Sequence, residues 1–224
     1  MNKMDNIIQL HPIGGSAPDR RELELIDLAR GGDMESFCKV YDLHKDGLYR
    51  YALYRLGSRE DAQDAVQECV LAAFRQIGEL RRSEAFKGWM YKILSGCCSR
   101  IIRTSMRDRE KMDKVRQQAA AAGKEGGRTT GSELYGRAES TAGASSPQDM
   151  TIESIALTQA LDQLDQESRD IVLMSVVGGL TSSEVSELIG IRPGSVRSRL
   201  SRSLRKMREY LEEPERGASQ AEQG

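Results

Sequence analysis

Two short segments near the C-terminus carry the residues best suited to contact nucleic acid. The first predicts a helix that begins after Thr181, and the second predicts a helix with Pro193 in its first turn, separated by a break at 190–191. Thr181 can cap the first helix, and Glu184 can complete a capping box. Proline suits a first helical turn because its missing N–H would have no partner there. The spacing predicts a helix-turn-helix, which places its second helix in the DNA major groove.

The second of these helices has one apolar and one cationic side. At about 100° per residue, the apolar stripe consists of Val196, Leu200, Leu204 and Met207. The other sides carry small hydroxyl residues and long cations, among them Arg197, Ser198, Arg199, Ser201, Arg202 and Arg205. Small residues let a backbone approach base edges, while arginines reach bases and phosphates. We expect this side to read DNA; the alternative is a solvated basic surface on an ordinary amphipathic helix.

Composition favours helices and a reducing compartment. Aromatic residues make up 5% of the 224 residues and charged residues 30%, so the core must come from aliphatic side chains that favour helices. The cysteines form no CxxC pair, and we expect Cys38 and Cys69 to be small buried hydrophobic residues. The cysteine pattern makes a reduced cytoplasm the simplest compartment. No run of about 18 apolar residues occurs, so we expect no membrane span.

Positive charge is concentrated in two places although the formal net charge is only −1. Residues 81–109 contain eight Lys or Arg and two acids, and residues 192–208 contain seven Lys or Arg and no acid. The chain therefore presents two separate basic patches on a nearly neutral protein.

The predicted fold class is all-α, with two small helical domains joined by a flexible linker and the helix-turn-helix in the C-terminal domain. We expect a disordered leader at 1–20, helical domains at 21–107 and 150–211, a linker at 108–149, and a disordered tail at 212–224. The linker is assigned because residues 119–147 are rich in Ala, Gly and Ser and have no apolar period. In the first domain, Asp33 and Ser58 are the expected N-caps, with separate helical segments on either side of Gly47.

The segment 58–77 predicts an amphipathic helix with an unusual outer face. Phased from Val66, its outward residues are Asp61, Asp64, Glu68, Leu71 and Arg75. A solvated face needs the charges but not Leu71. An apolar centre ringed by acids predicts a docking surface for a basic partner helix, and the alternative is a surface leucine of no consequence.

A second candidate nucleic-acid segment lies in the first domain. Trp89 and Tyr91 stand between Lys87 and Lys92, and aromatic rings beside cations suit single-stranded bases and their phosphates. The alternative is a tryptophan that belongs to the core. The preceding loop, GELRRSE, carries adjacent arginines and could hold a base extruded from the stack.

These segments resemble, in order, three parts of bacterial sigma factors. DAQDAVQECVLAAFRQI resembles the region that binds the RNA polymerase clamp helices, and FKGWMYKIL resembles the −10 reading segment. ALDQLDQESRDIVLMSVVGGLTSSEVSELIGIRPGSVRSRLSRSLRKMREYL resembles the −35 reading domain. The short two-domain layout is similar to the extracytoplasmic-function (ECF) branch of the sigma-70 family.

The resemblance implies a promoter-specificity subunit that joins core RNA polymerase, recognises promoter DNA and supports melting, with no catalysis, cofactor or metal of its own. The clamp helices of the largest polymerase subunit would contact Asp61, Asp64, Gln67, Glu68 and Leu71. The −10 element would contact Leu80, Arg81, Arg82, Ser83, Glu84, Lys87, Trp89 and Lys92. The −35 element would contact Arg197, Ser198, Arg199, Ser201, Arg202 and Arg205.

The chain departs from the family pattern at two places, and two other hypotheses compete with the resemblance. Gly96 stands where many relatives carry Asn, and Ser182 and Ser183 replace a usual aromatic residue. An anti-sigma factor is a partner that the resemblance allows. The competing hypotheses are a stand-alone helix-turn-helix regulator and an enzyme. His11 and His44 have no nucleophile arrangement around them, and neither a Walker loop nor a zinc spacing occurs.

Overall fold

The structure is a computed structural model that describes residues 18–122 and 152–212. Within these ranges all regular structure is helical, in the order α2 (Arg20–Arg30), α3 (Met34–Leu56), α4 (Arg59–Gln76), η1 (Ile77–Glu79), η2 (Ser83–Ala85), α5 (Phe86–Ala122), α6 (Ile152–Asp162), α7 (Gln166–Val172), η3 (Leu173–Val177), α8 (Ser182–Ile189) and α9 (Pro193–Glu212). The elements η1 and η2 are single 3-10 turns, and η3 is a turn of π-helix. The predicted all-α fold class is confirmed.

Short polar side chains cap the helices where the sequence predicts them. The Asp33 carboxylate accepts a hydrogen bond from the Ser36 backbone N–H at 3.0 Å, and the Ser58 hydroxyl accepts one from the Asp61 N–H at 3.3 Å. Helix α3 ends at Gly57, whose φ of 71° lies in the left-handed region that glycine adopts without steric cost. Both expected N-caps are confirmed.

Gly47 lies inside α3 and not between two helices, so the expected break at this position is wrong. A Cβ atom at position 47 would lie 2.9 Å from the hydroxyl oxygen of Tyr91 on α5. Glycine in a helix interior costs about 1 kcal/mol relative to alanine. The close contact between α3 and α5 explains the glycine here. Position 47 needs a residue without a side chain for helix packing, and not for a turn.

Helix α5 continues to Ala122, well past the expected end of the first domain at residue 107. The expected flexible linker is therefore wrong for residues 108–122. This segment contains no Gly or Pro and is rich in Arg, Lys, Gln and Ala, which are good helix formers. The rest of the expected linker, 123–149, lies outside the described residues, as do most of the expected leader and tail.

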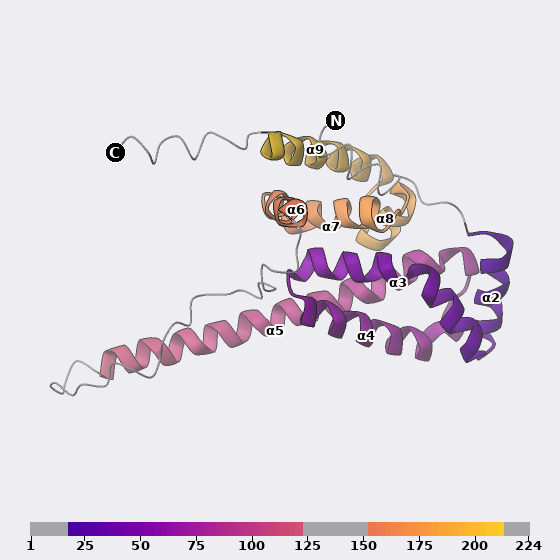
Figure 1. Cartoon of the computed structure of the whole chain (residues 1–224), viewed down its shortest axis with the longest axis horizontal. Coiled ribbons are helices and arrows are strands. Elements are labelled where there is room, and N and C mark those ends of the chain that lie inside the picture. The colour runs from indigo at the N-terminus through magenta and orange to yellow at the C-terminus, as the bar shows by residue number, and fades with distance from the viewer. Residues whose placement is uncertain (1–17, 123–151, 213–224) are drawn as a thin grey trace.

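The helices form two units that pack against each other (Figure 1). Helices α2 to α5 form the N-terminal unit, and α6 to α9 form the C-terminal unit on the side of α3 that faces away from α4. The element η3 packs against α3, and α9 is the outermost helix of the C-terminal unit. Buried residues of both units belong to one continuous apolar cluster. The C-terminal half of α5 extends beyond all other helices.

Among the described residues, no helix is both long and apolar enough to cross a membrane.

Candidate protein and nucleic-acid interfaces

Helices α8 and α9 form the predicted helix-turn-helix. The Thr181 hydroxyl accepts a hydrogen bond from the Glu184 backbone N–H at 3.3 Å, and the Glu184 carboxylate accepts one from the Thr181 N–H at 2.7 Å. This is the expected capping box. Gly190 ends α8 with a φ of 80°, and Pro193 is the first residue of α9, as expected. The turn is further fixed by the Ser186 hydroxyl, which donates to the Ile191 carbonyl.

The side chains of α9 divide between core and solvent as the phasing predicts. Val196 and Met207 are buried, whereas Arg197, Ser198, Ser201, Arg202 and Arg205 are exposed. Five of the six expected −35 residues thus lie on the free surface of the outermost helix.

Three of the expected −35 arginines have different hydrogen-bond and ion-pair partners. Arg199 is half-buried and pairs with Glu167 of α7, while Arg205 pairs with Glu209 one turn further along α9, at 3.8 Å. The Nε of Arg202 donates to the Ser198 carbonyl at 3.3 Å, which leaves its two terminal nitrogens toward solvent. The terminal nitrogens of Arg202 can therefore make a bidentate contact with a guanine edge. The Arg199 side chain instead contributes to packing between α9 and α7.

The outer face of α4 presents the predicted docking residues. Asp64, Gln67, Glu68 and Leu71 are exposed, and Leu71 is 51% exposed. Asp61 is half-buried in the first turn. The structure therefore keeps an apolar side chain among acids on the solvent side of this helix.

A groove of about 500 Å³ between α3 and α4 adjoins Leu71. Besides Leu71 and Gln67, its wall includes Tyr41, Tyr49 and Val70. Sequence reasoning missed the two tyrosines as surface residues. Their spacing of eight residues, two turns of helix, places them on one face of α3 and could have revealed the groove.

The loop before α5 separates the expected −10 residues into two groups. Leu80 and Ser83 are buried, and the Ser83 hydroxyl donates to the Asp27 carboxylate of α2 at 2.5 Å. This hydrogen bond is the main reason that the pKa of Asp27 is lowered. Arg81, Arg82 and Glu84 are exposed. Leu80 and Ser83 thus hold the loop against the N-terminal unit, and both also line the groove that contains Lys87, Trp89 and Lys92.

Lys87, Trp89 and Lys92 line a groove between the two units. Its volume is about 550 Å³, and its opposite wall includes Gly179 and Glu184 of the C-terminal unit. The Lys87 ammonium donates to the Gly179 carbonyl at 3.3 Å, and burial lowers the pKa of this amine. In this packed arrangement, part of the expected −10 surface faces the C-terminal unit.

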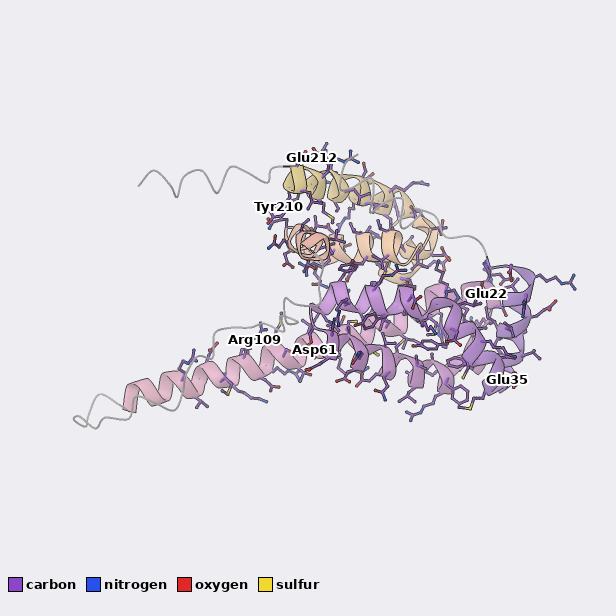
Figure 2. The ribbon with its side chains drawn as sticks, viewed as in Figure 1. Glu22, Glu35, Asp61, Arg109, Tyr210 and Glu212 are labelled. Carbon is purple, nitrogen blue, oxygen red and sulfur yellow. The ribbon has the colours of Figure 1, made fainter. Side chains whose placement is uncertain are left out.

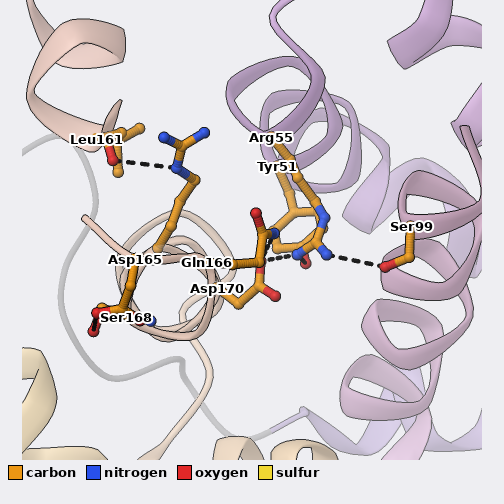
Figure 3. Close-up of polar contacts among 9 residues, drawn as sticks. Tyr51, Arg55, Ser99, Leu161, Asp165, Gln166, Ser168 and Asp170 are labelled. Carbon is orange, nitrogen blue, oxygen red and sulfur yellow. Dashed lines mark hydrogen bonds and ion pairs between the residues drawn. The ribbon is translucent and has the colours of Figure 1, made fainter. Parts of the chain in front are cut away.

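A second contact between the units is an ion pair of Arg55 on α3 with Asp170 on α7 (Figure 3). The Arg55 guanidinium pairs with Asp170 of α7 and donates to the Tyr51 hydroxyl and to the Ser99 hydroxyl, each at 3.0 Å. Arg55 is only 7% exposed. Sequence reasoning missed this residue, because nothing local distinguishes it from other arginines on amphipathic helices.

Three of the four cysteines are buried, but Cys38 is exposed, so its expected burial is wrong. Cys38 lies on the outer side of α3, where the neighbouring Phe37 takes the buried position. Cys69 is buried as expected, and burial raises the pKa of its thiol. In the described ranges, His, Cys, Asp and Glu side chains form no group of three or more that could hold a metal ion.

The chain matches two models of one protein family. Residues 40–108 match "Sigma-70 region 2", and residues 154–207 match "Sigma-70, region 4". These ranges cover most of the N-terminal unit and most of the C-terminal unit.

Curated relatives and solved structures agree with these matches. The chain is 27% identical over 195 residues to the ECF RNA polymerase sigma factor BldN of Streptomyces coelicolor. The matched segment is 85% of this chain and 66% of BldN. It is 25% identical over 190 residues to the ECF RNA polymerase sigma factor SigW of Bacillus subtilis. This second match spans 83% of this chain and 94% of SigW.

Two solved structures have a similar fold. One is CnrH in complex with the cytosolic domain of CnrY (TM-score 0.58, 17% identity, 86% of this chain and 97% of that chain). The other is the sigma factor RpoE in complex with the anti-sigma factor NepR from Bartonella quintana (TM-score 0.54, 16% identity, 81% of this chain and 99% of that chain).

The all-helical fold and the pair α8–α9 place the chain among helix-turn-helix proteins. The two matched regions define it further: the chain belongs to the sigma-70 family of RNA polymerase sigma factors, within the ECF group of its curated relatives.

Proposed function

We propose that this protein directs core RNA polymerase to specific promoters by reading their −10 and −35 elements and supporting DNA melting. The observation that carries the proposal is the presence of sigma-70 region 2 and region 4 in one chain, in the family's order. A stand-alone helix-turn-helix regulator needs only the second region, so that alternative is not favoured. The protein acts by binding and has no catalytic step of its own.

The proposed −35 surface is the exposed side of α9. Arg197, Ser198, Ser201 and Arg202 are its centre, since small hydroxyls there admit the helix to the major groove and arginines reach base edges. Arg199 lies at its margin, and Arg205 lies on the same side as Ser201 one turn further along α9; each is already paired with a carboxylate. We assign them to phosphate contacts.

The proposed polymerase surface is the outer face of α4. Asp61, Asp64, Gln67 and Glu68 supply its polar rim and Leu71 its apolar centre. The groove between α3 and α4 gives a partner helix room for its own apolar side chains beside Leu71. The clamp helices of the largest polymerase subunit are the proposed occupant.

The proposed −10 surface is formed by the loop before α5 and by the first turns of that helix. Arg81, Arg82 and Glu84 are exposed on the loop, and Lys87, Trp89 and Lys92 follow on α5. A half-exposed indole beside two amines can stack on an unpaired base while the amines contact its phosphates.

Two further expectations depend on family membership. Bartonella quintana RpoE was solved with an anti-sigma factor, and we include such a protein among the partners of this chain. Since core polymerase acts in the bacterial cytoplasm, we place the protein there.

Run-off transcription tests the proposed function. Purified core polymerase and the full chain are incubated with a promoter library, and transcripts are mapped to their start sites. We expect discrete transcripts that require the chain and share sequences near −10 and −35. A chain that protects DNA by itself, but supports no initiation with core on any template, would contradict the proposal.

A further inference from the structure

The inner face of α5 continues past the core that it helps to form. Leu94 and Cys97 are buried on this face, and Ile101 is half-buried at the edge of the N-terminal unit. The same spacing of three or four residues places Met112 and Val115 on this face further along the helix. Met112 is 70% exposed and Val115 is 60% exposed. The side of α5 that packs inside the N-terminal unit therefore becomes an apolar surface in water.

The part of α5 that carries these two side chains protrudes from the helical bundle. Every residue from 103 to 116 is exposed, and Figure 2 shows Arg109 on this protruding part. Within residues 18–122 and 152–212, no other helix lies against it. The match to sigma-70 region 2 ends at residue 108, so Met112 and Val115 also lie outside the matched range. Neither the fold nor the proposed function uses this apolar face.

The spacing along the face is that of a coiled-coil heptad. Its members are alternately four and three residues apart, and we call them the α5 seam: Ile101, Ser105, Asp108, Met112 and Val115. This alternation keeps one face of a helix turned toward a partner helix. The polar member Asp108 pairs with Lys111 at 3.1 Å, so its charge is balanced locally. From Ile101 to Val115 the seam is about 21 Å long at 1.5 Å per residue, which suits two heptads of a partner.

Cations border the α5 seam on both sides. Arg109 and Arg116 occupy heptad position e, and Lys111 occupies position g, the two positions whose charges select a partner. Among the residues that the structure describes, Arg109 and Arg116 have no ion-pair partner. In a pair formed by two copies of this chain, cations would face cations. Duplex DNA offers phosphates, but these leave Met112 and Val115 uncovered. The face therefore complements a helix with carboxylates at its flanks.

We propose that the α5 seam binds an acidic amphipathic helix of a partner protein other than core polymerase. The apolar side chains of that helix pack against Met112 and Val115, and its carboxylates pair with Arg109 and Arg116. The clamp contact proposed on α4 calls for a basic partner, so the two surfaces select partners of opposite charge. The seam goes beyond the proposed function, because its binding to a helix needs neither polymerase nor DNA.

Two designed peptides, each about three heptads long, test this assignment. The acidic peptide carries Leu at positions a and d and Glu at positions e and g. The basic peptide differs only in carrying Lys at e and g. Fluorescence anisotropy measures the Kd of each peptide for the full chain at one ionic strength, since surface charge pairs weaken with salt. We expect the acidic peptide to bind the wild-type chain at least about tenfold more tightly than the basic peptide.

Two methionine variants separate the seam from the rest of the protruding helix. Met112→Ala should weaken binding of the acidic peptide about fivefold, because it removes apolar surface that the peptide covers. Met106→Ala is the matched control, since Met106 is 57% exposed on another side of the same part of α5. It should leave the Kd unchanged. Both substitutions favour the helix, so a difference between them does not come from unfolding of α5.

Charge reversal tests the flanks of the seam. Arg109→Glu/Arg116→Glu should make the chain prefer the basic peptide. The control Arg107→Glu/Lys114→Glu changes the charge equally, with the same seven-residue separation, at positions turned further from the seam, and should retain the preference for the acidic peptide.

Equal affinity of the wild-type chain for both peptides would overturn the proposal, as would equal effects of a seam variant and its control. Displacement of the acidic peptide by core polymerase would also overturn it, because the seam would then be a polymerase contact. Light scattering on the wild-type chain gives a further check, and we expect a monomer. A dimer that Met112→Ala dissociates would assign the seam to a second copy of this chain.

Discussion

Arg55 of α3 and Asp170 of α7 form a buried ion pair that joins sigma-70 region 2 to region 4 (Figure 3). The guanidinium also donates to Tyr51 and Ser99 of the N-terminal unit, so it remains partly satisfied there if Asp170 leaves. The −10 and −35 elements lie about 25 base pairs apart, roughly 85 Å of B-DNA at 3.4 Å per pair. Two units in direct contact cannot span that distance. The proposed reading of both elements at once therefore requires the Arg55–Asp170 pair to open.

Removing the carboxylate of Asp170 should separate the two units. In Asp170→Asn the buried Arg55 guanidinium loses its counter-ion, which favours an arrangement in which water reaches this side chain. We expect a larger radius of gyration by small-angle X-ray scattering, with unchanged helix content by circular dichroism. Asp162→Asn is the control, since Asp162 pairs with Arg169 inside the C-terminal unit. An unchanged radius in Asp170→Asn would show that other contacts hold the units together.

Gly178 should resist substitution because its own unit on one side and Tyr91 of the other unit leave no room for a side chain. A Cβ there would lie 2.5 Å from the Met174 carbonyl oxygen and 3.0 Å from the Tyr91 ring. We expect Gly178→Ala to lower the free energy of unfolding by about 1–3 kcal/mol, as overpacking does. Gly194→Ala is the control, because a Cβ at Gly194 meets nothing within 4 Å. Thermal unfolding of both variants measures the difference, and equal Tm values would contradict it.

Local features of the sequence predicted much of this fold and much of the proposed site. The N-caps at Asp33 and Ser58 and the capping box at Thr181 follow from residue types three positions apart. The outward face of α9 follows from helical periodicity. Both signals lie within a few turns of chain.

Features that depend on contacts between distant residues could not be read from the sequence. Arg55 and Asp170 are joined only by the packing of the two units, and the same packing turns Lys87 toward Gly179. The burial of Ser83 depends on its hydrogen bond to Asp27, which lies on a separate helix. The helical segment 108–122 differs for another reason: the Gly-rich composition of the residues after it favours a linker, whereas the good helix formers within it favour a continuation of α5.

Leu71 should matter for polymerase binding and little for stability. The side chain is already half exposed, so Leu71→Ser removes little buried surface. If Leu71 is the apolar centre of the clamp contact, the substitution should cost about 2 kcal/mol of binding to core polymerase, roughly thirtyfold in Kd. Surface plasmon resonance with immobilised core measures this. Leu43→Ser is the control, since Leu43 is similarly exposed on α3, and an equal loss in both variants would contradict the assignment.

Arg202 should determine sequence preference at one position of the −35 element. Its terminal nitrogens are free to contact a base edge in bidentate fashion. We expect Arg202→Ala to reduce discrimination at one base pair by about 1–3 kcal/mol. Selection from a randomised −35 library with holoenzyme measures the change. Arg208→Ala, at the exposed far end of α9, should leave the preference unchanged. A loss of affinity that is equal for all sequences would assign Arg202 to a phosphate.

Asp165 should make the stability of the C-terminal unit depend on acid pH. Its carboxylate caps α7 and accepts hydrogen bonds from the Ser168 backbone N–H at 2.9 Å and the Ser168 hydroxyl at 2.8 Å, and these lower its pKa below 3.8. Because the folded pKa is depressed, the cap contributes fully above about pH 4 and its contribution is lost as the pH falls through the folded value.

Comparison of two variants isolates this titration. At pH 7, Asp165→Ala should lower the free energy of unfolding by about 1 kcal/mol, and the difference from wild type should shrink in urea titrations at pH 3 and below. Asp165→Asn caps the helix about as well but does not titrate, so its free energy of unfolding should fall less than that of wild type between pH 5 and pH 2. An alanine penalty that is as large in acid as at pH 7 would show that the ionised carboxylate is not what stabilises the start of α7.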